Sequence, residues 1–350
     1  MILFYLLACV GLAYGISKNL RSRLAKVTTW VVVMFLATSF FLSRLLPEGT
    51  PECIQSVIYA ISTTWLLYML YGSMLMILLY IGRWVMRIAQ KPVKPIGLST
   101  YVAIFLAVTT LLIAGYINAV SPRIVNYHVG LNGKRIVAVS DIHMGHGVGK
   151  SDVEKLVNIV NEQNADMCII AGDLFDGDIA PVVNGDLGAA MRNINCPIVA
   201  VMGNHEYIGG DPDRDAEYLR GLGINVLRDS AIVLNGYTIV GRDDVSGVRF
   251  KGLTKSIKEI VPDSLMNNLI VVDHQPYRID ESVENGAVLH ISGHTHAGQV
   301  WPMRIFTSMI FKLDYGMERF DGTAAIVTSG FGTWGPRVRL KTVSEVVVID

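Results

Sequence analysis

The sequence predicts an α/β protein, a sandwich of two central β-sheets flanked by helices, preceded by an all-α membrane domain with four spans. Two observations predict it. Long uncharged runs fill the first third of the 350-residue chain, and short apolar segments that end in polar residues recur through the remainder. Such runs suit membrane helices and buried strands respectively. Because the pattern of apolar and polar residues changes after Pro122, we expect a membrane domain over residues 1–122 and a globular domain over 123–350.

Charge and histidine are distributed unevenly along the chain. The 30 basic and 30 acidic residues balance overall, yet residues 1–123 hold ten Lys or Arg and only two carboxylates. By subtraction, the remainder holds 20 basic and 28 acidic residues, together with all eight histidines. The four cysteines show no paired zinc spacing, so we infer neither a disulfide framework nor a thiolate metal site. The first third is therefore basic and apolar, and the remainder is an acidic segment long enough for one buried domain.

Four apolar runs are the predicted membrane helices, at about residues 1–17, 27–46, 54–82 and 96–121. The last three are near or above the roughly 20 residues that cross a bilayer. The first is shorter and could be a signal peptide instead, although its basic residues follow it rather than precede it. The runs carry almost no ionisable groups, which favours an anchor over a transporter.

The loops between these runs predict the orientation of the chain. The loops after the first and the third run are rich in basic residues, namely Lys18, Arg21, Arg23 and Lys26, then Arg83, Arg87, Lys91 and Lys94. The loop after the second run has one Arg and two Glu. Under the positive-inside rule the two basic loops are cytoplasmic. We therefore expect an integral protein of a bacterial inner or cell membrane, with its globular domain outside the cytoplasm.

The globular part repeats one pattern five times, in which an apolar, β-branched run ends in polar residues that can bind metal. These residues are Asp141 and His143; Asp173; Asn204, His205 and Glu206; His274; and His294 and His296. The runs are short and apolar on both faces, so they indicate central strands. In α/β folds ligands gather at the carboxyl ends of strands, where all five groups lie.

Turn and helix signals complete the fold prediction. Asn132-Gly133 and Asn235-Gly236 each predict a β-hairpin. A helix should begin at Ser151 as its N-cap and place Val153, Leu156, Val157 and Val160 on one face. The helical segment at residues 213–223 ends at a glycine, a C-cap signal.

The polar groups contain carboxylates, an amide and imidazoles but no thiolate, a set that suits Mn, Fe or Zn. One metal takes about four to six ligands, so the set is too large for one ion and about right for two that share a carboxylate. Two such ions activate a water and neutralise the oxygens of a phosphorus centre during an in-line displacement. Phosphoester hydrolysis is the chemistry that this set favours.

The five groups resemble, in order and spacing, the sequence blocks of the calcineurin-like metallophosphoesterases over about residues 124–350. The matching blocks are Asp141-x-His143, Gly172-Asp173-x-x-Asp176, Gly203-Asn204-His205-Glu206, His274, and Gly293-His294-x-His296. The segments "GHTHAGQ" and "SGFGTWGPRVRL" are similar to the membrane-associated branch that includes the YkuE-type and YaeI-type bacterial phosphodiesterases.

The resemblance implies a role for each residue. Asp141, His143 and His296 would hold one divalent metal, and Asn204, His274 and His294 would hold the second. Asp173 would bridge the two ions, and a hydroxide between them would attack phosphorus. His205 would act as the acid or orient the phosphate, with Glu206 steadying its imidazole.

Several other residues leave alternatives open. Asp176 either supports the site or is a solvated loop residue, and His146 either contacts substrate or is a loop histidine. The segment after His296 either packs as core or forms an apolar, basic lip at the membrane surface. The lip residues would be Trp301, Arg304, Phe306 and Phe311.

Together these features predict a membrane-anchored, dinuclear metal-dependent phosphoesterase. Its substrate would be a phosphodiester, a pyrophosphate or a phosphomonoester, either a small molecule or linked to a lipid. Membrane lipids would be its other partners, and the sequence shows no evident nucleic-acid-binding pattern. The alternative is a non-catalytic metal-binding sensor or scaffold built on the same fold.

Overall fold

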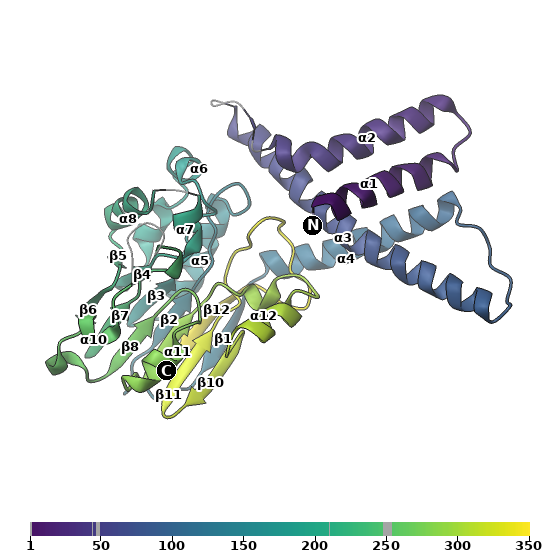
Figure 1. Cartoon of the computed structure of the whole chain (residues 1–350). Helices are drawn as coiled ribbons and strands as arrows, with labels where there is room; N and C mark the ends of the chain where they lie inside the picture. The colour runs from purple at the N-terminus through teal and green to yellow at the C-terminus, as the bar shows by residue number, and fades with distance from the viewer. Residues whose placement is uncertain (1, 44, 47–49, 210, 248–253) are drawn as a thin grey trace. The chain divides into compact units, whose positions relative to one another are not determined.

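The structure is a computed structural model that describes residues 2–43, 45–46, 50–209, 211–247 and 254–350 (Figure 1). The loop after the second predicted span, whose charges entered the orientation argument, lies partly outside the described residues. By its internal contacts the chain divides into two compact units. These are Met1–Gly115 with Gly335–Arg337, and Tyr116–Trp334 with Val338–Asp350.

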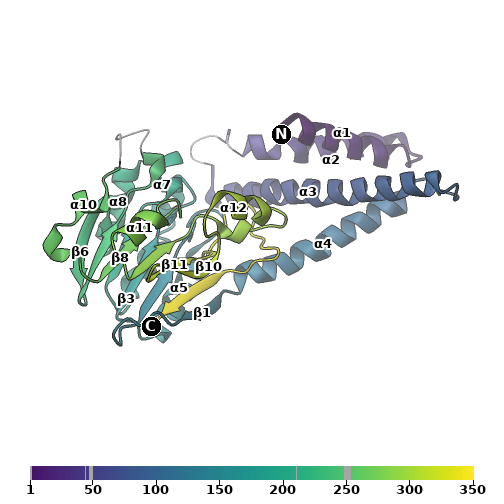
Figure 2. The same ribbon diagram turned by 60° about the horizontal axis from the view of Figure 1, so that its bottom comes forward.

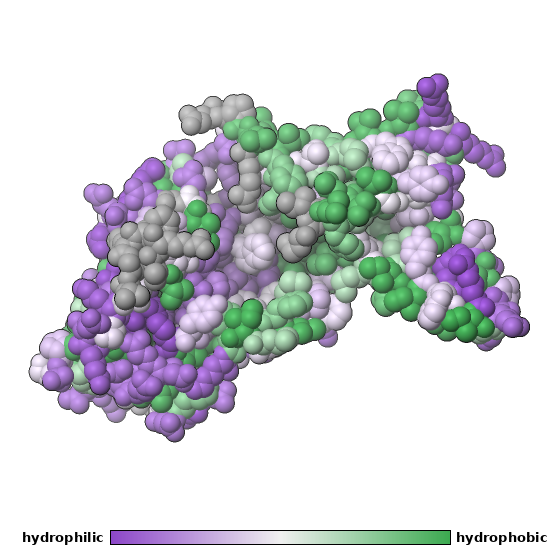
Figure 3. All heavy atoms as spheres, viewed as in Figure 1, coloured by the Kyte–Doolittle hydropathy of each residue, from purple (hydrophilic) through white to green (hydrophobic). Residues whose placement is uncertain are grey.

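The first unit is built from α-helices: α1 (Ile2–Ser17), α2 (Arg23–Leu42), α3 (Glu52–Ile88) and the greater part of α4 (Leu98–Val120). Among the described residues, α2, α3 and α4 are long and apolar enough to cross a membrane. Many of their large hydrophobic side chains are exposed in the protein alone, as Figure 3 shows in green. This pattern is the one expected of helices whose surroundings are lipid.

The first helix is shorter than the others. Its 16 residues extend about 24 Å at 1.5 Å per residue, less than the roughly 30 Å of a bilayer's hydrocarbon core. Three apolar helices of spanning length are therefore established within the described part of the chain, and a fourth span formed by α1 stays a prediction.

The second unit contains two six-stranded mixed sheets, which confirms the predicted sandwich (Figures 1 and 2). The strand order in the first sheet is β1 (Arg123–Tyr127), β12 (Glu345–Ile349), β2 (Ile136–Val139), β3 (Met167–Ala171), β4 (Ile198–Val201) and β5 (Asn225–Leu227). In the second it is β10 (Gly316–Phe320), β11 (Thr323–Val327), β9 (Leu289–Ser292), β8 (Leu269–Val272), β7 (Tyr237–Gly241) and β6 (Ser230–Leu234).

Helices flank the sheets, as the sequence predicts. They are α5 (Lys150–Glu162), α6 (Ala180–Asn184), α7 (Asn204–Ile208), α8 (Pro212–Gly221), α10 (Ile257–Ile260), α11 (Ile279–Glu284) and α12 (Arg304–Ile310). Short 3₁₀ turns lie at Ala189–Asn193, Val245–Gly247, Asp263–Leu265 and His296–Gly298.

Alternation along the strands builds the core. In β2, Ile136 and Ala138 join the apolar cluster between the two sheets, whereas Val137 and Val139 join the cluster under the helices of the first sheet. Side chains on a strand alternate between its faces, so a strand covered on both sides must be apolar throughout. The continuous apolar runs that defined the strands in the sequence follow from this double burial.

One predicted hairpin is confirmed and the other is wrong. β6 and β7 pair antiparallel around Asn235 and Gly236. Asn132 and Gly133 also adopt the left-handed turn conformation, with φ of 50° and 76°. However, β1 and β2 do not pair with each other, because β12 lies between them, parallel to β1 and antiparallel to β2.

The start of α5 is also corrected. The helix begins at Lys150 with Gly149 as its N-cap, and the Asp152 carboxylate accepts a hydrogen bond from the Gly149 backbone N–H at 3.1 Å. The predicted N-cap Ser151 is therefore wrong, and Asp152 is the acidic residue that caps the helix start. The C-cap signal of the 213–223 segment is confirmed, since Gly223 follows α8 with φ of 86°.

Strand direction determines where the functional residues gather. Strands β2, β3 and β4 run parallel in the first sheet, and β8, β9 and β11 run parallel in the second. Their carboxyl ends therefore lie along one edge of each sheet, and the loops that follow them carry the polar residues.

Candidate metal centre

The first group of side chains that could hold a metal ion is Asp141, His143 and His296. All three are buried, and each can offer one ligand atom within 4.8 Å of the others. The Nε2 atoms of His143 and His296 are 3.1 Å apart, and His296 Nε2 lies 3.2 Å from Asp141 Oδ1. Ring nitrogens and a carboxylate that converge on one point are an arrangement that suits a cation.

A second group gathers around Asp173, His274 and His294. His274 Nε2 lies 3.2 Å from Asp173 Oδ2 and 3.1 Å from Asn204 Oδ1. Asn204 Oδ1 is also 2.7 Å from His294 Nδ1. The Nδ1 atom of His274 lies 2.7 Å from the Ala171 carbonyl oxygen, so an Nδ1–H donor there leaves Nε2 free to bind a metal.

Asp173 lies between the two groups. Its Oδ2 atom is 3.2 Å from His274 Nε2 in one group and 3.8 Å from His143 Nε2 in the other. Its Oδ1 atom accepts a hydrogen bond from the His205 backbone N–H at 2.9 Å. This is the position that a carboxylate shared by two ions would need.

Two glycines make this close approach feasible. A Cβ atom added at Gly203 would lie 2.1 Å from Asp173 Oδ1, and one at Gly293 would lie 2.4 Å from Asp141 Oδ2. Real Cβ atoms do not approach other atoms so closely, so the carboxylates would have to move. The glycines in the Gly-Asn-His-Glu and Gly-His-x-His blocks thus make room for the carboxylates.

The pKa shifts within the two groups are mixed. Those of His294, His296 and Asp173 favour the forms that bind metal. Burial lowers the pKa of His296 well below its ordinary value, and burial next to His274 lowers the pKa of His294 to about 3. Burial alone would raise the pKa of Asp173, but the neighbouring His274 outweighs it and holds that pKa well below its usual range. Neutral imidazoles and an ionised carboxylate are the forms that bind metals.

Three other side chains of these groups shift toward their protonated forms. Burial raises the pKa of Asp141. Nearby carboxylates outweigh burial and raise the pKa of His143 and of His274.

His205 differs from these residues in its partners. Its side chain is 27% exposed, and its Nδ1 atom lies 3.6 Å from Asp176 Oδ1. The same Asp176 oxygen is 3.5 Å from His143 Nδ1. Asp176 therefore lies beside both imidazoles, close to the site rather than in an isolated solvated loop.

The expected pairing of Glu206 with His205 is wrong. Glu206 Oε2 accepts a hydrogen bond from the Gly203 backbone N–H at 2.6 Å, and Oε1 accepts one from the Phe175 N–H at 3.0 Å. Glu206 is the third residue of α7, from which an acidic side chain turns back to cap the helix start. The carboxylate beside His205 is Asp176.

The remaining predicted residues lie around this centre. His146 is partly exposed and belongs to neither group of converging side chains. Trp301, Arg304 and Phe306 are exposed. Phe311 is half-buried, and its ring centroid lies 5.8 Å from that of His294.

Arg339 is a residue of the site that sequence reasoning missed. It is fully buried, and its Nη2 atom donates to the carbonyl oxygens of Ser329 and Gly332, each at 2.6 Å. The same atom lies 3.3 Å from His296 Nδ1, on the side of the ring opposite the other metal-binding side chains. Its place in "SGFGTWGPRVRL" was the only signal, because nothing local shows that an arginine will be buried against backbone carbonyls.

Comparison with known proteins gives consistent matches. Residues 134–298 match the family model described as calcineurin-like phosphoesterase. A zebrafish "Transmembrane protein with metallophosphoesterase domain" is 27% identical over 75% of this chain and 65% of its own length. An "Uncharacterized metallophosphoesterase" of Aquifex aeolicus is 30% identical over 61% of this chain and 84% of its own. The Bacillus subtilis protein YkuE, also described as an uncharacterized metallophosphoesterase, is 24% identical over 63% of this chain and 79% of its own length.

Proposed function

Because this chain belongs to the calcineurin-like metallophosphoesterase family, we propose that it is a membrane-anchored phosphoesterase that uses two divalent metal ions. The observation that supports this best is the position of Asp173 between two groups of ligands. Asp141, His143 and His296 would hold one ion, and Asn204, His274 and His294 the other. Ions of the Mn, Fe or Zn class fit this mixed oxygen and nitrogen set.

The bound ions would supply an activated water and neutralise the charge on the phosphate oxygens. The protein's own part is to orient the substrate and to move a proton. His205 lies next to the ligand groups and is partly exposed, so its imidazole can reach a phosphate oxygen or a leaving group. Asp176, beside His205 Nδ1, would fix the orientation of that ring.

Burial of the ligands supports hydrolysis over simple metal storage. Asp141, His143 and Asp173 are at most 2% exposed, so an anionic phosphate bound there would interact in a medium of low dielectric. The substrate would be a phosphodiester, a pyrophosphate or a phosphomonoester, either a small molecule or linked to a lipid.

Cellular location is part of the same proposal. The basic loops at both ends of the α2–α3 segment favour a cytoplasmic position for those loops. The phosphoesterase domain would then follow α4 on the outer face of a bacterial inner or cell membrane. The helices would contact membrane lipids.

A direct test uses the full chain in detergent, stripped of metal with a chelator. We expect hydrolysis of bis(p-nitrophenyl) phosphate to disappear on chelation and to return with Mn²⁺, Fe²⁺ or Zn²⁺. Asp173→Asn should prevent that recovery, because an amide cannot provide the same charge to both ions. Activity that persists in chelator would contradict the proposal.

A further inference from the structure

An exposed apolar surface surrounds α12. No residue of this helix is buried, although it is mostly hydrophobic. Six large side chains on or before it form what we call the α12 patch: Trp301 (45% exposed), Met303 (36%), Ile305 (53%), Phe306 (56%), Met309 (79%) and Ile310 (59%). Figure 3 shows hydrophobic residues at this position on a largely hydrophilic domain. The alternative that the segment packs as core is wrong, and such patches mark interaction sites.

The α12 patch begins next to the end of the last membrane helix. Asn118 of α4 donates through Nδ2 to the Arg339 carbonyl oxygen at 3.2 Å, and Ser344 Oγ donates to the Ala119 carbonyl oxygen at 2.8 Å. The next residue, Leu340, accepts a hydrogen bond from the Trp301 backbone N–H at 3.2 Å. One short backbone segment therefore joins the end of α4 to the start of the patch.

This position favours a lipid bilayer as the partner of the patch. The 23 residues of α4 extend about 34 Å, close to the roughly 30 Å hydrocarbon thickness, so the end of α4 lies at the membrane surface. Only two residues separate α4 from β1, which keeps the domain at that surface. A Trp together with large aliphatic side chains is the composition that inserts at the interface.

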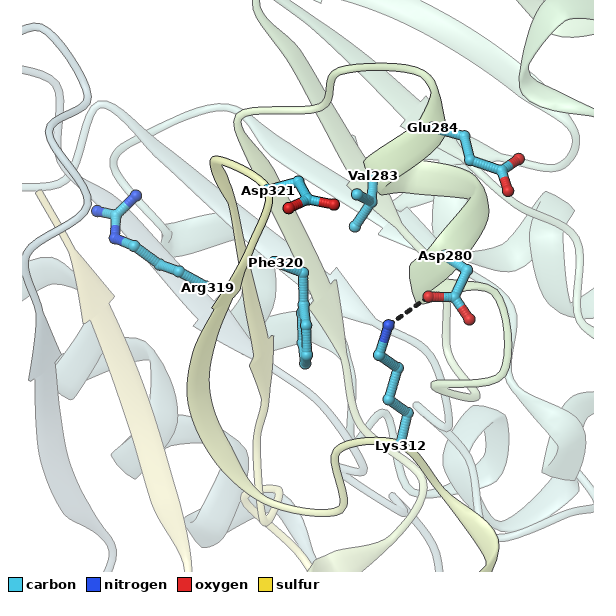
Figure 4. A pocket seen from close by; sticks show the side chains of 7 residues that line it. All are labelled: Asp280, Val283, Glu284, Lys312, Arg319, Phe320 and Asp321. Carbon is cyan, nitrogen blue, oxygen red and sulfur yellow. Dashed lines mark hydrogen bonds and ion pairs between the residues drawn. The ribbon is translucent and has the colours of Figure 1, made fainter.

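The cations near the patch are already paired. Arg304 Nε lies 3.3 Å from Asp314 Oδ2, and Lys312 forms an ion pair with Asp280. Figure 4 shows the Lys312 amino group directed toward Asp280, and both residues line a cavity of about 390 Å³. The expected basic character of the lip is thus largely neutralised, and apolar insertion would drive contact with lipid of either charge.

The patch leads toward the metal centre through Phe311. This residue follows α12 directly, and its ring centroid is 4.8 Å from that of Tyr277 and 5.8 Å from that of His294. We propose that the α12 patch inserts into the bilayer surface and presents the metal centre to phosphate esters whose hydrocarbon chain stays in the membrane. The substrate part of this inference rests on the proposed function; the docking part does not.

Docking is tested with the full chain in nanodiscs of phosphatidylcholine, with and without bromine on the acyl chains. Bromine quenches the fluorescence of a tryptophan that enters the lipid. The emission of Trp301 is obtained as the difference in fluorescence between the wild type and Trp301→Phe. We expect the Trp301 emission to be lower in brominated discs than in plain discs. The decrease should be the same whether or not the discs also contain anionic lipid. Equal Trp301 emission in brominated and plain discs would overturn docking on lipid. If the discs then also contained two chains each, the partner of the patch would be a second copy of this chain.

Substrate delivery is tested with two phosphodiesters that share a leaving group, methyl and hexadecyl p-nitrophenyl phosphate. We expect Ile305→Ser/Met309→Ser/Ile310→Ser to lower the ratio of kcat/KM for the hexadecyl over the methyl ester at least about tenfold. Val233→Ser/Leu265→Ser is the matched control, because these side chains are also exposed (55% and 39%) but belong to β6 and to the Asp263–Leu265 turn rather than to α12. That control should leave the ratio as in the wild type.

The two measurements separate the two ideas. An unchanged ratio in the α12 variant, with both esters hydrolysed, would overturn delivery by the patch. If the wild type hydrolyses neither ester, the proposed function fails, and the quenching measurement alone decides whether the patch docks on lipid.

Discussion

At the scale of single residues, His205 is the side chain that we expect to act on the substrate rather than on the ions. His205→Ala should lower kcat for bis(p-nitrophenyl) phosphate by about 10²- to 10⁴-fold, the usual contribution of a general acid or base, with the metal content unchanged. Asp176→Asn should lower kcat less, because the ring remains but loses its charged partner. Metal analysis alongside kinetics checks both, and a variant that loses its metal would contradict the assignment.

A second residue-scale prediction concerns His290, which is buried in β9 with its ring nitrogens 2.7 Å from Ser282 Oγ and 2.9 Å from Ser292 Oγ. Burial lowers the pKa of His290 to about 4. In the unfolded chain its pKa is about 6.5, so the unfolded state binds a proton first as the pH falls. Neutral His290 therefore contributes its full stabilisation above pH 6.5. As the pH falls from 6.5 to 4, this contribution to the free energy of unfolding decreases by about 3 kcal/mol.

The measurement is denaturant unfolding of the full chain in detergent, in chelator, at several pH values between 7 and 4. Between pH 7 and pH 4 the unfolding free energy of His290→Gln should fall by about 3 kcal/mol less than that of the wild type, because the glutamine amide does not titrate. Parallel curves for the two proteins would contradict the prediction.

The candidate metal ligands were predictable from the sequence because each follows a strand with a continuous apolar run. Their types and their order carry the chemistry, so Asp173 and His274 could be placed in one centre although 100 residues separate them. The direction of a side chain within a block was not predictable. Glu206 turns back to cap its own helix, and this local hydrogen bonding takes it away from His205.

At the scale of elements, the strand-to-helix turn before α7 controls the centre. In Gly203→Ala the new Cβ would meet the Asp173 carboxylate and backbone N, so we expect the shared carboxylate to be displaced and the metal content to fall. Gly221→Ala is the matched control, because its Cβ would meet nothing within 4 Å. Metal analysis of both proteins checks the prediction, and a Gly203→Ala protein with full metal content would contradict it.

Strand pairing is a feature that local sequence patterns do not predict. The Asn132-Gly133 turn forms as its residues predict, yet its flanking strands pair with β12, which begins at Glu345. Turn chemistry acts within four residues, whereas pairing depends on which apolar strand completes the buried sheet. The residues of the turn therefore cannot predict pairing with β12, which lies more than 200 positions further along the chain.

At the scale of the whole molecule, the basic loops predict which side of the membrane carries the metal centre. Alkaline phosphatase fused after Asp350 should be active in a bacterial host, and a green fluorescent protein fused there through the Sec route should be dark. Replacing Lys91 and Lys94 by Glu should weaken this bias, since basic residues retain their loop in the cytoplasm. A fluorescent fusion with inactive phosphatase would reverse the orientation.

The central claim is that two ions share Asp173, and a count of bound metal tests it most directly. Equilibrium dialysis of the chelated full chain against Mn²⁺, followed by elemental analysis, should give two ions per chain. His296→Ala and His274→Ala should each retain one, whereas Asp173→Asn should weaken both. A wild-type protein that binds a single ion, with Asp173→Asn unaffected, would contradict the account.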